Sequence, residues 1–385
     1  MSTSADDLVT AAQERTGLGD LGPDTWRPGL HILITELESN ASVTEDGKKR
    51  MFGEFTDALA NRLRVIDYSA RHPELREQPT ERPMVILGMP RTGTTVASCL
   101  LDQDPKYRSL LNWEALDSVP PPTTETLRTD HRCLTKLKTQ QDNMEVLRAF
   151  DIAPPHWEWA DGPTECIFLH GQDFKAFYWD AMMPTPAYSD WLLDTNMISA
   201  YEYEKTVLQI LQSQAPGRWS LKMPSHAVHI ETLLDVFPDA RLVWAHRDPY
   251  AVLGSLCSTQ KLAKGSVSTN VDPEYIGRHS VTQLRAHIDR ATATRDRIGD
   301  HRFFDLHYAD LMNDPIATME RLYAWDGEEL TADVEKRMRQ WIVANPQDKH
   351  GRHSYTLAEY GQSVEAVQPY FADYIERYAV VVDGA

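Results

Sequence analysis

Cysteine is scarce in this chain, and its cysteines are widely separated. The 385 residues include four of them, Cys99, Cys133, Cys166 and Cys257, and no pair has the C-x-x-C spacing. Zinc ribbons and disulfide-stapled domains need closely spaced or numerous cysteines, so this spacing argues against both. Cysteine is also among the residue types most often buried in protein interiors. We therefore expect four reduced thiols in the core.

Long apolar runs and an excess of basic residues are missing as well. No stretch approaches the roughly 20 apolar residues of a membrane span, and the start, MSTSADDLVT, lacks the basic and apolar regions of a secretion signal. A cytoplasmic protein without stable membrane insertion is expected. Lys and Arg total 39 against 57 Asp and Glu, a formal net charge of -18. Such a charge disfavours nucleic acid as a partner, so an anionic ligand would need a few locally placed cations.

What the chain does have is apolar material for a sizeable core and a regular alternation of elements. Hydrophobic residues make up 42% of the sequence, which suits one large domain or two. The spacing of apolar residues predicts amphipathic helices in residues 1–80 and a mostly helical structure in residues 127–215. Short apolar runs typical of strands occur at 84–87, 107–111, 218–223, 241–246 and 302–308. Strands that alternate with helices predict an α/β fold with a mostly parallel central sheet flanked by helices.

The first of these runs leads into a glycine-rich sequence, VILGMPRTGTT, at residues 85–95. A strand, a glycine-rich turn and a helix in this order form a cradle for phosphate, because the N–H groups of the helix's first turn have no backbone partner. The loop fits G-x-x-x-x-G, but Thr94 stands where a nucleoside-triphosphate P-loop has lysine. Arg91 is the cation that the loop offers instead. An ordinary strand-to-helix turn is the alternative interpretation of so short a pattern.

A second candidate anion site lies in RLVWAHRDPYAVLGSLCS, at residues 241–258. The pattern predicts a strand and then a helix, with Asp248 as the N-cap and Pro249 at the first helical position. Arg247 therefore follows the carboxyl end of a parallel strand, where ligands of open α/β sheets bind. Ser255 lies eight residues further, about two helical turns along. A guanidinium and a hydroxyl suit a phosphate, although each is also common in a purely structural role.

Taken together, GMPRTGTT and RDPYAVLGS resemble the two phosphate-binding motifs of the sulfotransferases that use 3'-phosphoadenosine 5'-phosphosulfate (PAPS). SLKMPSH is similar to the lysine-bearing strand end that precedes that family's second motif, and YADLMNDPIATMERLYAW resembles its tyrosine-aspartate segment and following helix. The resemblance, which is to the bacterial branch, covers about residues 82–378. It implies a P-loop-like sulfotransferase fold with a helical N-terminal cap at 1–80, packed on an α/β domain at 81–385. In that fold, residues 127–215 form a helical insertion on the acceptor side.

The resemblance also implies a donor site for PAPS and for its product, 3'-phosphoadenosine 5'-phosphate (PAP). Arg91 would hold the 5'-phosphosulfate together with the backbone N–H groups that follow it, those of Thr92, Gly93, Thr94 and Thr95. Arg247 and Ser255 would hold the 3'-phosphate. The stretch DKHGRHSYTLAEYG loosely matches the family's basic glycine loop, so Lys349 or Arg352 would add to the 3'-phosphate site.

The catalytic residues follow from the same resemblance. Sulfuryl transfer parallels phosphoryl transfer, in which positioning and electrostatics supply most of the catalysis. Arg91 would stabilise the leaving phosphate, and Lys222, at the end of a strand, would stabilise the sulfuryl and bridging oxygens. Three residues are candidates for the general base. Glu165 is narrowly favoured, because it resembles a glutamate of the bacterial and carbohydrate-acting branches. His226 is close behind it, and His170 is a distant third. No metal is expected, since PAPS lacks the contiguous β- and γ-phosphates that bind magnesium.

The acceptor is expected to be a hydroxyl of a small or lipid-like molecule. Aromatic residues crowd between positions 157 and 203, where they are suited to wall an acceptor pocket or to pack a helical subdomain, the second use being favoured. They include Trp157, Trp159, Phe168, Phe174, Phe177, Tyr178, Trp179, Tyr188 and Trp191. Two rival functions remain open. One is a P-loop kinase or other phosphoryl transferase, which Thr94 disfavours, and the other is a non-catalytic nucleotide-binding protein.

Overall fold

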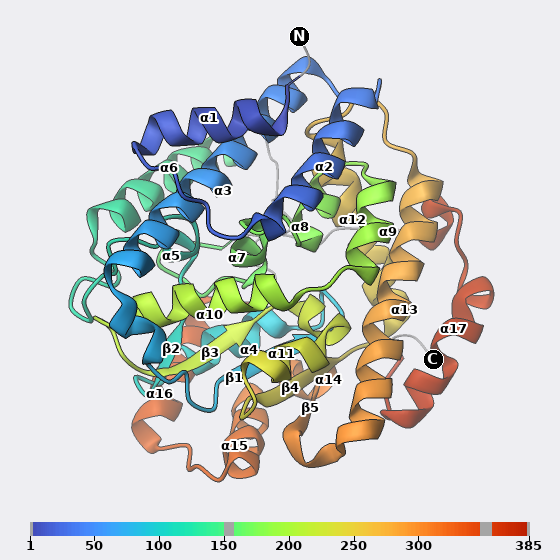
Figure 1. The fold of residues 1–385 in the computed structure, drawn as a ribbon. Helices are drawn as coiled ribbons and strands as arrows, with labels where there is room; N and C mark the ends of the chain where they lie inside the picture. The colour runs from blue at the N-terminus through green and yellow to red at the C-terminus, as the bar shows by residue number, and fades with distance from the viewer. Residues whose placement is uncertain (1–2, 150–157, 347–355, 383–385) are drawn as a thin grey trace.

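A sheet of five strands lies at the centre of the computed structural model, which describes residues 3–149, 158–346 and 356–382 (Figure 1). The strand order is β2-β3-β1-β4-β5, and every neighbouring pair is parallel. The strands are β1 (Met84–Gly88), β2 (Tyr107–Ser109), β3 (Arg218–Lys222), β4 (Arg241–His246) and β5 (Phe303–His307). All five predicted strands are therefore confirmed, and the α/β fold with them.

Strand β1 is central and apolar on both sides because helices cover both faces of the sheet. Val85 and Leu87 belong to a large core cluster on one face, whereas Met84 and Ile86 belong to a second cluster on the other. This alternation follows from the two-residue period of a strand. The register pairs Ile86 with Lys222 and Gly88 with Ala245, so the carboxyl ends of β3, β1 and β4 share one edge of the sheet. Ligands of open parallel sheets bind at that edge.

The N-terminal region consists of three helices, α1 (Ala5–Thr16), α2 (Arg27–Ser39) and α3 (Glu45–Arg71), and two short 3-10 turns, η1 (Asp24–Trp26) and η2 (Pro73–Glu77). In Figure 1, α1 and α2 lie above α7 and α8, and α3 runs down past α5, whereas α15 and α16 lie at the bottom of the view. Buried side chains of α3 recur at helical spacing and join the large core cluster; they include Met51, Phe55, Leu59 and Leu63. The division of the chain at residue 80 into a cap and a main domain stays a prediction.

The middle of the chain is largely helical. It contains α4 (Thr94–Leu101), α5 (Asn112–Leu116), α6 (His131–Ala149), α7 (Ile167–Gly171), α8 (Phe177–Met182), α9 (Pro186–Asp194) and α10 (Ile198–Gln212). Helix α4 follows the glycine-rich loop, and α10 leads into β3. The role of residues 127–215 as an acceptor-side insertion stays a prediction.

The remaining helices follow β3, β4 and β5 along the chain. They are α11 (Ile230–Val236), α12 (Pro249–Gly265), α13 (Pro273–Ile298), α14 (Tyr308–Asn313), α15 (Pro315–Asp326), α16 (Ala332–Ala344) and α17 (Val364–Arg377), with the 3-10 turns η3 (Pro224–Val228), η4 (Asp300–Arg302) and η5 (Leu357–Tyr360). Helix α12 begins as predicted, because the Asp248 carboxylate accepts from the Tyr250 N–H and Pro249 occupies the first turn. In the described part of the chain, no helix combines the length and apolar character that crossing a membrane requires.

Candidate functional site

The glycine-rich loop between β1 and α4 has the backbone geometry of an anion cradle. Gly88, Arg91 and Gly93 have φ values of 140°, 65° and 85°. A Cβ at Gly88 would lie 2.6 Å from the Ala245 carbonyl oxygen, so only glycine fits this approach of β1 to β4. Gly93 is the N-cap of α4 and no side chain caps the helix, which leaves its first-turn N–H groups for a ligand.

Three polar side chains predicted for the donor site meet beside this loop. The Arg91 Nε donates to the Ser255 hydroxyl over 3.1 Å, and an Arg247 guanidinium N–H donates to the Arg91 carbonyl over 2.7 Å. Arg247 also stacks 4.0 Å above the Tyr308 ring. Its Nε is buried and has no hydrogen-bond partner among the described residues. A buried guanidinium N–H without a partner is a ready donor for an anion.

A small cavity adjoins Arg247 at the carboxyl ends of β4 and β5. Its volume is about 240 Å³, and its lining includes His246, Arg247, His307 and Tyr308 together with residues 379–381. The cavity therefore extends the polar edge of the sheet away from the glycine-rich loop.

Lys222 ends β3 beside the same loop, with its side chain buried. Its Nζ lies 2.8 Å from Glu158 Oε1, 3.0 Å from Glu165 Oε1 and 3.5 Å from the Thr95 hydroxyl. Burial disfavours its charge, but Glu158 and Glu165 outweigh that effect and hold the pKa of Lys222 above its ordinary value. The amine is therefore a permanent cation between two carboxylates.

Glu158 is a site residue that the sequence did not single out. Its second oxygen accepts a hydrogen bond from the Thr164 hydroxyl, and its side chain is 7% exposed, against 19% for Glu165. Gln140 of α6 holds the adjacent backbone, since its amide donates to the Glu158 carbonyl over 3.0 Å. The sequence does show Glu158 as a second acid in the segment that contains Glu165. Its contact with Lys222 could not be predicted, because that contact depends on how residues 158–165 fold.

The two predicted histidines lie deeper, in a closed polar cluster. His226 is fully buried, its Nδ1 lies 3.0 Å from the Tyr201 hydroxyl, and burial lowers its pKa to about 3. His170 Nε2 lies 2.8 Å from Glu204 Oε2. The imidazole of His226 is therefore neutral and enclosed, whereas the Glu165 carboxylate is partly exposed and touches Lys222. This geometry favours Glu165 as the base, a role that remains a prediction for all three residues.

Residues 83–333 match the model of the sulfotransferase family, which is more than half of the chain. The chain belongs to the sulfotransferase family. The resemblance inferred from the two phosphate-binding motifs is thereby confirmed.

Solved structures and curated proteins agree with this assignment. Sulfotransferase STF9 from Mycobacterium avium is 49% identical with a TM-score of 0.94, and the match covers 100% of this chain and 99% of that one. Sulfotransferase STF1 from Mycobacterium tuberculosis H37Rv is 28% identical with a TM-score of 0.83, covering 96% and 99%. The omega-hydroxy-beta-dihydromenaquinone-9 sulfotransferase Stf3 of Mycobacterium tuberculosis (strain CDC 1551 / Oshkosh) is 26% identical over 310 residues, 77% of this chain and 74% of that protein. The sulfotransferase fold expected from the sequence is confirmed.

Some predicted residues of this sulfotransferase lie elsewhere than expected or outside the described residues. Lys349 and Arg352 belong to the segment 347–355, and Trp157 to 150–157, which the structure does not describe. The four cysteines are free thiols, but Cys99 is only partly buried and so departs from the expected core position.

The aromatic-rich region of this sulfotransferase packs the core with some of its rings and lines a cavity with others. Phe174 and Tyr188 are buried in the large core cluster. A cavity of about 460 Å³ between α3 and α7 is lined by Phe168, Tyr178 and Trp179, among others. A pocket that combines aromatic walls with a few polar groups suits an organic acceptor. Its use as the acceptor pocket stays a prediction.

Proposed function

We propose that this sulfotransferase transfers a sulfuryl group from PAPS to a hydroxyl of a lipid-like acceptor. The observation that carries the donor assignment is the contact of Arg91 with Ser255 and of Arg247 with the Arg91 carbonyl, because it joins the two phosphate-binding motifs in one place. The buried Arg247 Nε has no hydrogen-bond partner among the described residues, so it adds a donor that is available to a ligand. The acceptor class is supported by the related Stf3, whose name gives a hydroxylated menaquinone derivative as its acceptor.

Each donor-binding residue has a distinct task in this proposal. The first-turn N–H groups of α4 and the Arg91 guanidinium would bind the 5'-phosphosulfate, since both are donors that favour an anion. Arg247 and Ser255 would bind the 3'-phosphate. PAPS, when bound, supplies an activated sulfuryl group whose bond to the 5'-phosphate breaks as a bond to the acceptor oxygen forms. The backbone N–H of Thr92 would join the groups that bind the 5'-phosphosulfate, and its hydroxyl would stabilise the loop by donating to the Met89 carbonyl over 2.7 Å.

Lys222 and the two carboxylates would act on the acceptor side. Charge builds on the sulfuryl and bridging oxygens during transfer, and a preorganised ammonium group stabilises it. The acceptor hydroxyl loses its proton in the same step, and Glu165 would receive it. Glu158 would keep Lys222 in place, since its side chain is the less exposed of the two and is also held by Thr164.

The rival functions differ in what they require of the site. A kinase would need a lysine after Gly93, but this chain has Thr94 there, and the Lys222 amine reaches the loop from β3 through Thr95. A non-catalytic nucleotide-binding protein would have no use for a lysine held by two carboxylates at the edge of the cradle. Both features favour transfer over the alternatives.

The test is PAP binding by calorimetry, followed by transfer of labelled sulfate from PAPS to a set of hydroxylated lipids and phenols. PAP should bind equally with magnesium or with a chelator, and Arg91→Ala should weaken binding by at least tenfold. The matched control is Arg339→Ala, which removes an exposed arginine of α16 that pairs with Glu335. ATP with magnesium binding more tightly than PAP would favour the kinase, and PAP binding without transfer to any acceptor would favour the non-catalytic alternative.

A further inference from the structure

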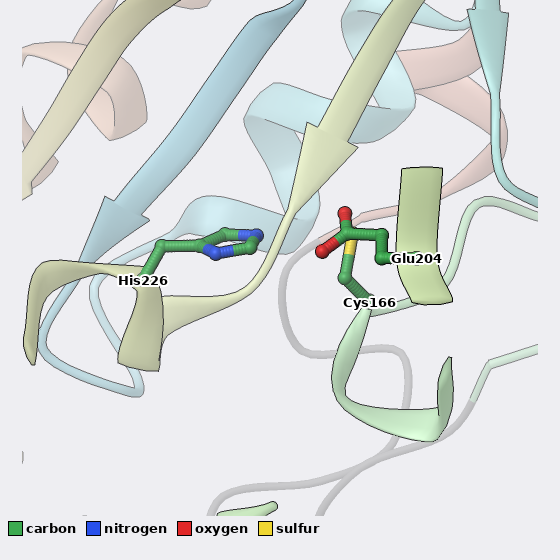
Figure 2. A group of neighbouring side chains, drawn as sticks. All are labelled: Cys166, Glu204 and His226. Carbon is green, nitrogen blue, oxygen red and sulfur yellow. The ribbon is translucent and has the colours of Figure 1, made fainter. Parts of the chain in front are cut away.

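A buried cluster of three potential metal ligands lies behind the candidate active site. Cys166 precedes α7, Glu204 belongs to α10 and His226 to η3, and all three are buried. One ligand atom from each residue lies within 4.8 Å of the other two. Figure 2 shows the imidazole edge of His226 pointing toward the carboxylate and the thiol. We propose that Cys166, Glu204 and His226 bind a Zn²⁺ ion.

Unpartnered atoms at the centre of the cluster point to a missing ligand. Nδ1 of His226 is occupied by Tyr201, but its Nε2 is buried and has no hydrogen-bond partner among the described residues. Glu204 Oε1 is buried too, and no N–H or O–H donor from the described residues reaches it. The Cys166 thiol hydrogen-bonds the Glu204 carboxylate, but a thiol is only a weak donor. Buried polar atoms are satisfied in most proteins, so the His226 Nε2 without a partner among the described residues, beside a carboxylate oxygen that only a thiol reaches, calls for an occupant.

The donor set selects the metal. A thiolate, an imidazole and a carboxylate are the three ligand types that zinc takes, whereas calcium and magnesium prefer oxygen ligands alone. Binding breaks the Cys166 S–H bond, forms the zinc–sulfur bond and releases the proton to solvent. The thiolate, the Glu204 carboxylate and the dication then sum to zero charge, which a buried site tolerates. These side chains would supply three of the four ligands of a zinc ion and leave the fourth position to a water, and they would have to close by about 1 Å to do so.

The surrounding contacts are those that orient metal ligands. His170 donates to the outer oxygen of Glu204 over 2.8 Å, and Tyr201 contacts the far nitrogen of His226 over 3.0 Å. If Nδ1–H donates to the tyrosine oxygen, the Nε2 lone pair faces the cluster. Such outer partners fix the tautomer and the orientation of the ligands in zinc proteins.

The site would join two segments that carry the candidate active-site residues. Cys166 directly follows Glu165, and its backbone N–H donates to the Lys222 carbonyl over 3.0 Å. His226 lies four residues beyond Lys222. Zinc would therefore fix the segments behind the site without contacting the donor or acceptor. The cysteine spacing could not reveal it, because the ligands come from three separate elements.

The test is zinc and cobalt binding by the full chain. Because the ligands are buried, the chain is refolded with either metal in excess, passed through gel filtration and analysed by mass spectrometry. We expect one zinc ion per chain and, with Co²⁺, the thiolate-to-metal charge-transfer absorption. Cys166→Ser should abolish both signals, whereas Cys257→Ser, which changes a buried thiol of α12, should retain them.

A second pair of variants tests whether the His226 imidazole binds the metal. The metal content of the native chain is a further test that needs no variant. His226→Gln should lose the metal, and His287→Gln, which changes a buried histidine of α13, should keep it. Tyr201→Phe should weaken zinc binding about 10-fold to 100-fold. A folded native chain without bound zinc, or with cobalt but no thiolate absorption, would overturn the proposal. So would equal metal content in Cys166→Ser and Cys257→Ser. These measurements use neither donor nor acceptor, so they are independent of the proposed function.

Discussion

Replacing Lys222 with methionine tests the centre of the proposed mechanism. Methionine keeps an unbranched apolar stem, so the change removes mainly the ammonium group that lies 2.8 Å from Glu158 and 3.0 Å from Glu165. If Lys222 stabilises the charge that builds on the sulfuryl oxygens, kcat should fall about 100-fold to 1,000-fold, as it does when one preorganised donor is removed. PAP affinity should change much less, because the proposed phosphate-binding groups of α4 and α12 are untouched.

The same variant should lose stability in a way that depends on pH. Removing one partner of a buried ion pair costs about 3 to 5 kcal/mol, and here two carboxylates would face each other without a counter-charge. One of them should then hold a proton, so its folded pKa would lie above the unfolded value of about 4.3. A group with a raised folded pKa contributes fully below its unfolded pKa and loses that contribution as pH rises through the folded value. The deficit should therefore shrink as pH falls from about 8 to about 5.5.

The native protein supplies the reference for this pH dependence. Burial works against the charge of Lys222, but Glu158 and Glu165 hold its pKa above the ordinary value. Its contribution is therefore fully present below the unfolded lysine pKa of about 10.4 and is lost only as pH rises through the higher folded value. Between about pH 8 and about 5.5 the charge of Lys222 stays constant, so a change in the stability difference between variant and native protein comes from the variant's carboxylates.

Urea unfolding at both ends of this pH range and single-turnover transfer of labelled sulfate are the assays. The control Lys138→Met changes a lysine of α6 whose side chain is 76% exposed, and it should affect neither measurement. Adding Glu158→Gln and Glu165→Gln to Lys222→Met should recover stability but not activity. Transfer within tenfold of the native rate, in a Lys222→Met protein that unfolds cooperatively, would refute the catalytic role. If the loss of stability does not depend on pH, the explanation that the two carboxylates lack a counter-charge is wrong.

Three further predictions concern the cradle and the base. Arg247→Met should weaken PAP binding about 10-fold to 100-fold, which is the value of a charged hydrogen bond. Binding of adenosine 5'-phosphate, which lacks the 3'-phosphate, should weaken much less. Equal weakening of both ligands in calorimetry would contradict 3'-phosphate recognition. Gly88→Ala should cost more than about 1 kcal/mol in urea unfolding, given φ 140° and a 2.6 Å approach to a carbonyl, whereas Gly53→Ala, with open space around it, should be neutral or stabilising. Glu165→Gln should lower kcat about 100-fold to 10,000-fold, measured as transfer of labelled sulfate. The same loss in Glu158→Gln alone would reassign the base.

Most of the sheet and the donor cradle could be predicted because their signals are local. Strands β1 and β4 lie in short apolar runs, and the α12 start is encoded by Asp248 and Pro249. Parallel strands place their carboxyl ends at one edge, so Arg91, Lys222 and Arg247 were expected near each other from connectivity alone. The contact of Arg91 with Ser255 was not predicted, since Ser255 was expected to act with Arg247.

The features that the sequence did not predict arise where a loop brings distant positions together. Glu158 reaches Lys222 because Gln140 of α6 and Thr164 hold both ends of its segment, and neither contact has a periodic pattern. The position of Cys166 likewise depends on a loop contact, because its backbone N–H donates to the Lys222 carbonyl. For Glu158 the charge of Lys222 decides the arrangement, because a buried ammonium needs carboxylates as partners. Predicting these partners therefore requires first asking what a buried lysine at a strand end must contact.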